Sequence, residues 1–217
     1  MKIYTEIQQG TEDWFRIKYR KVGGTSSKGL FVPSDTLLLK LLAESTEPFE
    51  LEDDGYESAA MLRGKELEPR HRSEIETYTG VKFNVPGWLL SDECPLIGIS
   101  PDGISEDLTV SWEGKSPGAD KHISTVYSKE IPADNIHQSL HYFTVNPKLE
   151  KHYFSSFRPE SDYPLFVKLL TLDSLIDLGT KAKPNVKKVS EWRQIGLGNA
   201  LELEANLQIE LTNLKKI

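Results

Sequence analysis

Two acidic residues and a lysine in the middle of the chain have the spacing of a catalytic site. Asp102 lies in a Ser-Pro-Asp-Gly segment, and Glu113 follows it by eleven residues and precedes Lys115 by two. Residues two apart on a β-strand point to the same face, so Glu113 and Lys115 are expected to share one. Because buried charges must be paired or bound to a metal ion, this pair on an inner strand indicates a functional site.

The chemistry that suits these three side chains is metal-dependent hydrolysis of a phosphodiester. Two carboxylates a few ångström apart repel unless a cation joins them, and oxygen ligands favour Mg²⁺, with Mn²⁺ as a substitute. Such an ion polarises a phosphodiester oxygen and lowers the pKa of a bound water. Lys115 could hold or deprotonate that water, or stabilise negative charge on the phosphate. Pro-Asp-Gly alone is also a common turn, and Glu-x-Lys alone a common surface pair. Their combination and order favour the catalytic interpretation.

The composition is that of an ordinary globular protein. The chain has 217 residues, 38% of them hydrophobic and 27% charged, which suits one domain with a sizeable core. We expect a single nuclease domain over residues 1–217, with a helical C-terminal region at about 160–217. No apolar run approaches the ~20 residues of a membrane span, so no membrane partner is expected. The single Cys94 fits a reducing cytoplasm.

The distribution of charge is uneven along the chain. A net charge of −7 argues against a protein that coats nucleic acid by bulk charge, but it allows a local basic groove. Two clusters of basic residues are present: Arg16, Lys18, Arg20, Lys21 and Lys28, and then Lys181, Lys183, Lys187, Lys188 and Arg193. Each cluster alone is typical of a solvated face.

Helices are predicted on both sides of the central motifs. Thr11 is the expected N-cap of a short helix, and Ser34 or Asp35 caps an apolar one. A longer helix is expected over about 56–78, ended by Gly80. Pro132 suits the first turn of a further helix. The last helix carries an i, i+4 stripe that predicts a core or subunit contact, formed by Leu203, Leu207, Leu211 and Leu214.

The middle of the chain has the pattern of short strands. Four segments rich in β-formers are predicted to form a consecutive antiparallel meander: 81–85, 88–90, 96–99 and 108–112. If 96–99 pairs with 108–112 as a hairpin, Asp102 folds back towards Glu113. A further strand is expected at 151–157. These elements predict an α/β (α+β) fold, in which helices flank a central mixed β-sheet that contains the antiparallel meander.

Several ordered motifs between about residues 10 and 157 resemble those of the YqaJ-like viral recombinases. This lambda-exonuclease-like family belongs to the restriction-endonuclease-like nuclease superfamily. The motifs are 10–16 (GTEDWFR), 22–26 (VGGTS), 64–68 (GKELE), 100–103 (SPDG), 113–117 (EGKSP) and 136–142 (IHQSLHY). No resemblance is apparent downstream of residue 157.

The resemblance implies a restriction-endonuclease-like core and a role for each matched residue. Asp102 and Glu113 would bind the catalytic Mg²⁺, joined by Glu68 and the backbone carbonyl of Gly114. Lys115 would position or activate the water. Residues assigned by the resemblance to the water, the scissile strand or the DNA are Gln138, Tyr142, Arg16, Lys18, Arg20, Thr25 and Ser26.

The chain departs from the family pattern at a few positions. Lys18 stands where the family carries an arginine for the 5′-terminal phosphate, and lysine supplies charge without a bidentate fork. Thr25 replaces a serine at the same phosphate, and Leu140 replaces a second glutamine. Outside the motifs, His71 and His122 are expected to be surface or packing residues.

The function implied by the resemblance is that of a 5′→3′ exonuclease on linear double-stranded DNA. It would release 5′-mononucleotides and leave 3′ single strands for phage-type recombination by strand annealing. A ring-shaped homotrimer, a single-strand annealing protein as partner and the cytoplasm of a bacterial host are implied as well. Two alternatives stay open: an endonuclease of the same fold in repair or restriction, and a non-catalytic DNA-binding module. Covalently closed circular DNA separates the two nucleases, since an exonuclease leaves it intact.

Overall fold

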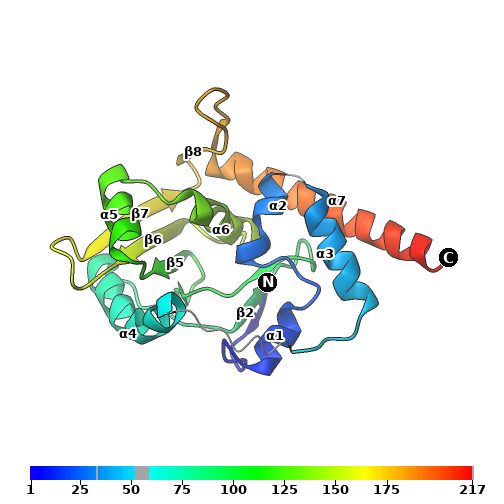
Figure 1. Cartoon of the computed structure of the whole chain (residues 1–217), viewed down its shortest axis with the longest axis horizontal. Helices are drawn as coiled ribbons and strands as arrows, with labels where there is room; N and C mark the ends of the chain where they lie inside the picture. The colour runs from blue at the N-terminus through cyan, green and yellow to red at the C-terminus, as the bar shows by residue number, and fades with distance from the viewer. Residues whose placement is uncertain (33, 52–58, 217) are drawn as a thin grey trace.

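The central sheet is organised around strand β5 (Val110–Lys115). Its four strands lie in the order β4-β5-β6-β7, with β4 at Gly103–Ile104, β6 at Lys151–Phe157 and β7 at Leu165–Thr171. Strands β4 and β5 pair antiparallel, as do β6 and β7, whereas β5 and β6 run parallel. The sheet is seen in a computed structural model that describes residues 1–32, 34–51 and 59–216 (Figure 1).

Helices cover both faces of β5. Parallel pairing requires a crossover connection, which is supplied by α5 (Ala119–Ser128) and α6 (Ala133–Val145). Helix α4 (Ala59–Thr79) lies on the opposite face, where Ile75 packs with Phe83 and Trp112. Figure 1 shows β5 between α4 and the α5–α6 pair. Side chains alternate along a strand, so consecutive residues of β5 meet different helices.

The N-terminal part adds a second layer. Its antiparallel sheet has the order β1-β2-β3, with β1 at Lys2–Tyr4, β2 at Trp88–Leu90 and β3 at Gly98–Ile99. The helices of this part are α1 (Glu12–Lys18), the 3₁₀ turn η1 (Gly24–Ser26), α2 (Lys28–Phe31) and α3 (Asp35–Thr46). Thr11 and Ser34 occupy the N-cap positions of α1 and α3, although neither side chain makes a capping hydrogen bond.

The C-terminal part consists of a hairpin and a long helix. Strands β8 (Leu175–Asp177) and β9 (Val186–Lys188) pair antiparallel, and Figure 1 shows their loop standing away from the body. Helix α7 (Val189–Leu214) packs on α2, α3 and α6. Leu207 is buried in the core and Leu203 and Leu211 pack against it, whereas Leu214 is exposed. Most of the predicted leucine stripe is therefore core.

The predicted fold class is confirmed, and the segments 88–90 and 96–99 pair antiparallel as the meander predicts, but the next pairing of the meander is wrong. The expected hairpin between 96–99 and 108–112 does not form. Strand β3 pairs with β2 instead, because the Ser91 amide donates to the Ile97 carbonyl (3.1 Å) and closes that hairpin. The two-residue strand β4 takes the place beside β5. Asp102 therefore lies between two sheets rather than at the tip of one hairpin.

The prediction of a helical region over about 160–217 is also wrong in its first half. Strands β7, β8 and β9 precede α7, which begins only at Val189. The apolar run in β7 fits a helix or a buried strand equally by pattern, and its full-length pairing with β6 decides for the strand. The predicted long helix is α4, which ends before Gly80 in the left-handed conformation (φ +69°). Residues 56–58 of that prediction lie outside the described residues. Across the described ranges, no helix is long and apolar enough to cross a membrane.

Candidate active site

Strand β5 places Glu113 at the centre of a charged cluster. The carboxylate is 1% exposed and both of its oxygens are hydrogen-bonded. Lys115 Nζ donates to Oε1, and the Tyr142 hydroxyl on α6 donates to Oε2. The same hydroxyl lies 3.3 Å from the Trp112 carbonyl oxygen. Glu113 and Lys115 share one face of the strand, as their spacing predicts.

Asp102 reaches this cluster from the turn that precedes β4. Its Oδ2 accepts a hydrogen bond from the Gly114 amide (2.8 Å), which fixes the carboxylate beside β5. Burial, followed by the charge of Glu113, raises the pKa of Asp102 to about 8. Burial alone would lower the pKa of Lys115, but the carboxylates of Glu113 and Asp102 raise it above its ordinary value. The structure thus brings together the acid, acid and lysine singled out by the sequence.

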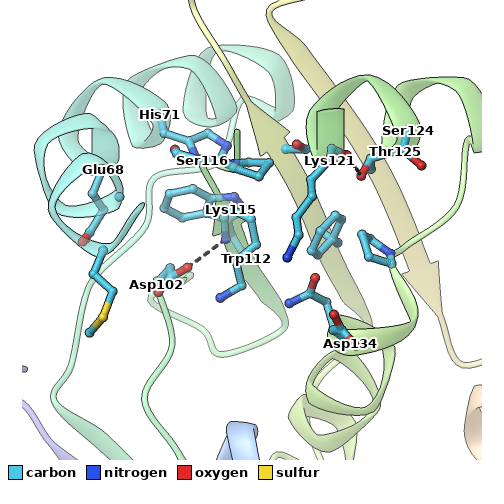
Figure 2. Close-up of a pocket in the computed structure, with 18 of the residues that line it drawn as sticks. Glu68, His71, Asp102, Trp112, Lys115, Ser116, Lys121, Ser124, Thr125 and Asp134 are labelled. Atoms are coloured by element: carbon cyan, nitrogen blue, oxygen red, sulfur yellow. Dashed lines mark hydrogen bonds between the residues drawn. The ribbon is translucent and has the colours of Figure 1, made fainter. Parts of the chain in front are cut away.

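A pocket of about 920 Å³ opens beside these residues. Figure 2 shows Glu68, Asp102 and Lys115 reaching it from α4, the turn before β4 and β5 respectively. Its walls come from α4, β5 and α5 and include Glu68, His71, Asp102, Trp112, Lys115 and Lys121. The polar and charged lining suits a phosphate-bearing ligand.

The donor atoms fit a divalent cation, although the predicted shell is not complete. Glu113 raises the pKa of Asp102, and a cation held by oxygen ligands would relieve that repulsion. Within the part of the chain that the structure describes, no three His, Cys, Asp or Glu side chains converge closely enough to hold a metal ion. Glu68 lines the pocket but is ion-paired with Arg72 on the next turn of α4. The structure therefore presents the carboxylate pair of Asp102 and Glu113, with Glu68 at the pocket wall and ion-paired with Arg72.

The other face of β5 carries a buried neutral network. His71 on α4 is 2% exposed, and its Nε2 lies 2.7 Å from Ser155 Oγ on β6. Trp112 Nε1 donates to the same Ser155 Oγ (2.7 Å). Burial, then the charge of Lys115, lowers the pKa of His71 to about 3. A Cβ at Gly114 would lie 2.8 Å from His71 Cε1, so the ring packs directly on the strand of the active site.

His71 is the site residue whose role the sequence does not reveal. Of the two expectations for His71, surface or packing, the structure shows packing: the residue is 2% exposed, and it also lines the pocket. The available signal is its position three residues after Glu68, which puts both on one side of a helix. His122 is also buried, where its Nδ1 lies 2.8 Å from Ser156 Oγ.

A second pocket, of about 700 Å³, gathers three of the predicted DNA-binding residues. Lys18, Thr25 and Ser26 all line it. The Lys18 ammonium lies 3.2 Å from the centre of the Trp14 ring. Burial, then the charge of Lys40, lowers the pKa of Lys18 to about 8. Lys40 is ion-paired with Glu44, and Glu47 and Glu50 also line this pocket, so Lys18 is a cation there that an anionic ligand would meet.

Gln138 on α6 packs against the η1 turn. A Cβ at Gly24 would lie 2.9 Å from Gln138 Cγ, so α6 approaches the η1 turn as closely as a glycine permits. Gln138 itself does not line the pocket beside Asp102. The predicted water-orienting residue is therefore packed against the turn that carries Thr25 and Ser26.

Three predicted DNA contacts are occupied elsewhere. Tyr142 is 1% exposed and bound to Glu113, so it supports the active site rather than facing DNA. The Arg20 guanidinium donates to the carbonyl oxygens of Glu44 and Glu47 (both 2.7 Å) and holds the end of α3. Arg16 is ion-paired with Glu12 and is more than half exposed. DNA contacts by these three side chains stay predictions, because spacing shows neither the depth of a side chain nor its partners.

Comparisons with known proteins match most of the chain. A family model described as the YqaJ-like viral recombinase domain matches residues 13–148. A solved alkaline exonuclease (LHK-Exo) from Laribacter hongkongensis is 23% identical, with a TM-score of 0.70 over 95% of this chain and 99% of that chain. The structure of LHK-Exo in complex with dAMP gives 0.71 at the same identity and coverage. These likenesses show the restriction-endonuclease-like fold. A search of curated proteins finds no match.

Proposed function

The chain belongs to the YqaJ-like viral recombinase family, and from this premise we propose that it is a metal-dependent 5′→3′ exonuclease. Its substrate is linear double-stranded DNA, from which it releases 5′-mononucleotides and leaves 3′ single strands. The observation that carries the proposal is that Asp102 and Lys115 line one pocket and that Glu113 is buried directly beside them. The exonuclease described for LHK-Exo, which shares the fold, supports the choice of reaction.

The residues of the site divide the chemistry among them. When bound, Mg²⁺ would polarise the scissile phosphate and acidify a water. Asp102, Glu113 and the Gly114 carbonyl would hold the ion, joined by Glu68 once it leaves Arg72. Tyr142 donates to Glu113 and keeps that carboxylate in one orientation. Mn²⁺ would substitute, because it takes the same oxygen ligands.

Lys115 acts as a cation rather than as a base in this proposal. The neighbouring carboxylates raise the pKa of Lys115, so its ammonium stays protonated at neutral pH. A protonated lysine can orient the attacking water or stabilise charge that develops on the phosphate. The Lys115 side chain contacts Glu113 and lines the pocket in which the water and the phosphate would lie.

The second pocket is assigned to the 5′-terminal phosphate. Lys18 supplies a charge there, and Thr25 and Ser26 supply hydroxyl groups. Gln138 packs on the η1 turn, which carries Thr25 and Ser26, so we assign it to orienting the end of the scissile strand. Lysine lacks the bidentate fork of arginine, and the preference for a 5′-phosphate over a 5′-hydroxyl is accordingly expected to be modest.

The wider biological setting rests on the family resemblance alone. We propose a ring-shaped homotrimer that threads DNA, a single-strand annealing protein as partner, and action in the cytoplasm of a bacterial host. An acidic exterior around a basic channel would reconcile the net charge of −7 with DNA binding.

The test compares DNA forms and metal conditions. Purified protein is incubated with linear duplexes carrying 5′-phosphate or 5′-hydroxyl ends and with covalently closed circles, in Mg²⁺ and in EDTA. We expect mononucleotides from linear DNA only, only with Mg²⁺, and faster from phosphorylated ends. Cutting of the closed circles would replace the proposal by an endonuclease. Binding without any metal-dependent product would leave a non-catalytic DNA-binding module.

A further inference from the structure

The β8–β9 hairpin carries a cluster of lysines, although the chain as a whole is acidic. Four lysines occur within residues 181–188, in a protein whose net charge is −7. Lys187 donates to Asn185, and Lys188 is ion-paired with Asp173. Lys181 and Lys183 are exposed, and their side chains have no hydrogen-bond or ion-pair partner among the described residues. These two ammonium groups at the tip are therefore available to a ligand.

The hairpin is a built structure rather than a loose loop. Asp177 Oδ1 accepts from the amides of Gly179 (2.8 Å) and Asn185 (2.7 Å), which closes the loop at its base. The backbones of Thr180 and Lys183 exchange two hydrogen bonds of 3.0 Å at the tip. Trp192 Nε1 donates to the Ile176 carbonyl and ties the hairpin to α7. The lysines are thus presented on a fixed support, which lowers the entropic cost of binding.

A groove leads from the hairpin towards the active site. This hollow of about 520 Å³ is lined by hairpin residues and by Lys28, His137 and Lys168, the last ion-paired with Glu130. The start of α6 separates it from the active-site pocket, because Ala133 lines the groove while Asp134 lines the pocket. A strand that leaves the pocket over this first turn would meet the groove and then the hairpin.

The composition of the tip selects the chemistry of the ligand. Residues 179–184 (GTKAKP) contain no large apolar or aromatic side chain, which a protein-binding hot spot usually supplies. Two lysines without acidic partners are instead the point charges that contact phosphate oxygens. We propose that the β8–β9 hairpin binds the phosphodiester backbone of DNA outside the active site, through Lys181 and Lys183. The identification of DNA as the polyanion rests on the proposed function.

The number of phosphates contacted can be counted from the salt dependence of binding. Wild-type protein and a K181Q/K183Q variant are titrated in EDTA with a labelled duplex and with the corresponding single strand, from about 50 to 200 mM salt. A K215Q/K216Q variant serves as the control, because it removes the same charge at the far end of α7. A helix of 26 residues separates that pair from the hairpin, or about 39 Å at 1.5 Å per residue.

On the duplex, log K falls as log salt rises, and we expect this slope to be less steep by about 2 in the hairpin variant. Each lost phosphate contact removes about 0.9 from its magnitude. Affinity at 0.1 M salt then falls by about 10- to 100-fold, while the melting temperature and the control variant match wild type. An effect on the duplex alone assigns the hairpin to the incoming substrate, and an effect on the single strand alone assigns it to the remaining strand. An unchanged slope, or an equal loss in the control, would overturn the inference.

Failure of this inference and failure of the proposed function give different results. Binding is measured without metal and therefore without cleavage, and Mg²⁺-dependent cleavage of a linear duplex is measured alongside. If the protein cleaves DNA and the hairpin variant has the wild-type salt dependence of binding, only the hairpin inference is contradicted. If the salt dependence of binding is weaker in the hairpin variant but the protein never cleaves DNA, only the proposed exonuclease activity is contradicted.

Discussion

The two faces of β5 differ in charge: one carries a charged cluster and the other a neutral hydrogen-bond network. On the face towards α6, Glu113 holds a negative charge between Lys115 and Tyr142. On the face towards α4, Trp112 and His71 meet at Ser155 without any formal charge. Glu113 and Tyr142 are as buried as the second set, whereas Lys115 reaches the pocket, and only the first set has a second carboxylate beside it, that of Asp102. One strand thus separates a charged cluster from a neutral one.

The difference shows how a site can respond to ions and protons while its strand keeps its position. Charged groups in a low dielectric interact strongly, so the α6 face changes with ions and protons. A satisfied neutral network does not depend on ions, so the α4 face can keep the strand in place while the charges change. Substitutions on the two faces should therefore affect different quantities: catalysis and metal binding on one, stability on the other.

The largest effect is expected from Glu113→Gln. The amide keeps the shape and the acceptor for Tyr142, but it removes the charge that would bind a cation. We expect the turnover rate to fall on the order of 10³-fold, since metal assistance is worth several kcal/mol. The melting temperature should fall only modestly, because the amide loses the ion pair with Lys115 but keeps its packing and its acceptor for Tyr142. Initial rates on linear duplex at saturating Mg²⁺ measure the effect, and a loss below tenfold would contradict the role.

Tyr142→Phe tests whether the α6 face depends on the orientation of the carboxylate. Removing the hydroxyl leaves Glu113 Oε2 without its donor. Loss of such a supporting partner typically costs about 10- to 100-fold in metal affinity or activity. The Mg²⁺ concentration at half-maximal rate is the readout. Tyr127→Phe, at a side chain that is 90% exposed, is the matched control and should leave that concentration unchanged.

Ser155→Ala addresses the α4 face. The substitution leaves Trp112 Nε1 and His71 Nε2 without a partner in the interior. We expect a loss of about 1–3 kcal/mol in the free energy of unfolding, with the turnover rate within a few-fold of wild type. Urea denaturation measures the first quantity. Ser73→Ala, at an exposed position on α4, provides the control. A large drop in rate at unchanged stability would erase the distinction between the faces.

A change of one pH unit is expected to have the smallest effect, and the two faces respond to it in opposite directions. The pKa of His71 is lowered to about 3, so the folded state binds fewer protons than the unfolded state below about 6.5. Its contribution is complete above that pH and is lost as pH falls. The pKa of Asp102 is raised to about 8, so its contribution is lost as pH rises from about 4 towards 8.

Melting temperatures in EDTA and in Mg²⁺ separate these two effects. Mg²⁺ should raise the melting temperature at pH 8, where it relieves the ionised carboxylates, and should have little effect at pH 5. Each group changes the stability by at most about 1.4 kcal/mol per pH unit. Equal stabilisation by Mg²⁺ at both pH values would show that the cation does not act on Asp102.

The sequence locates the charged face well and the neutral face poorly. Asp102, Glu113 and Lys115 follow from local spacing, because a period of two settles which side chains share a strand face. The partner strand was mispredicted because β3 and β4 are only two residues long, and pairing of such segments is decided by tertiary contacts. The link between His71 and Ser155 spans 84 positions between two polar residues, which propensity places at the surface.

The parallel pairing of β5 and β6 has a consequence for how the protein is made. These strands cannot meet until the whole α5–α6 crossover has been synthesised, and such long-range pairing is slow because the connecting segment must be ordered first. A nascent chain that has been synthesised only as far as Lys115 already contains both acids but still lacks Tyr142 and β6. Hydrolytic capacity is therefore expected to appear all at once, when folding is complete, and not gradually during translation.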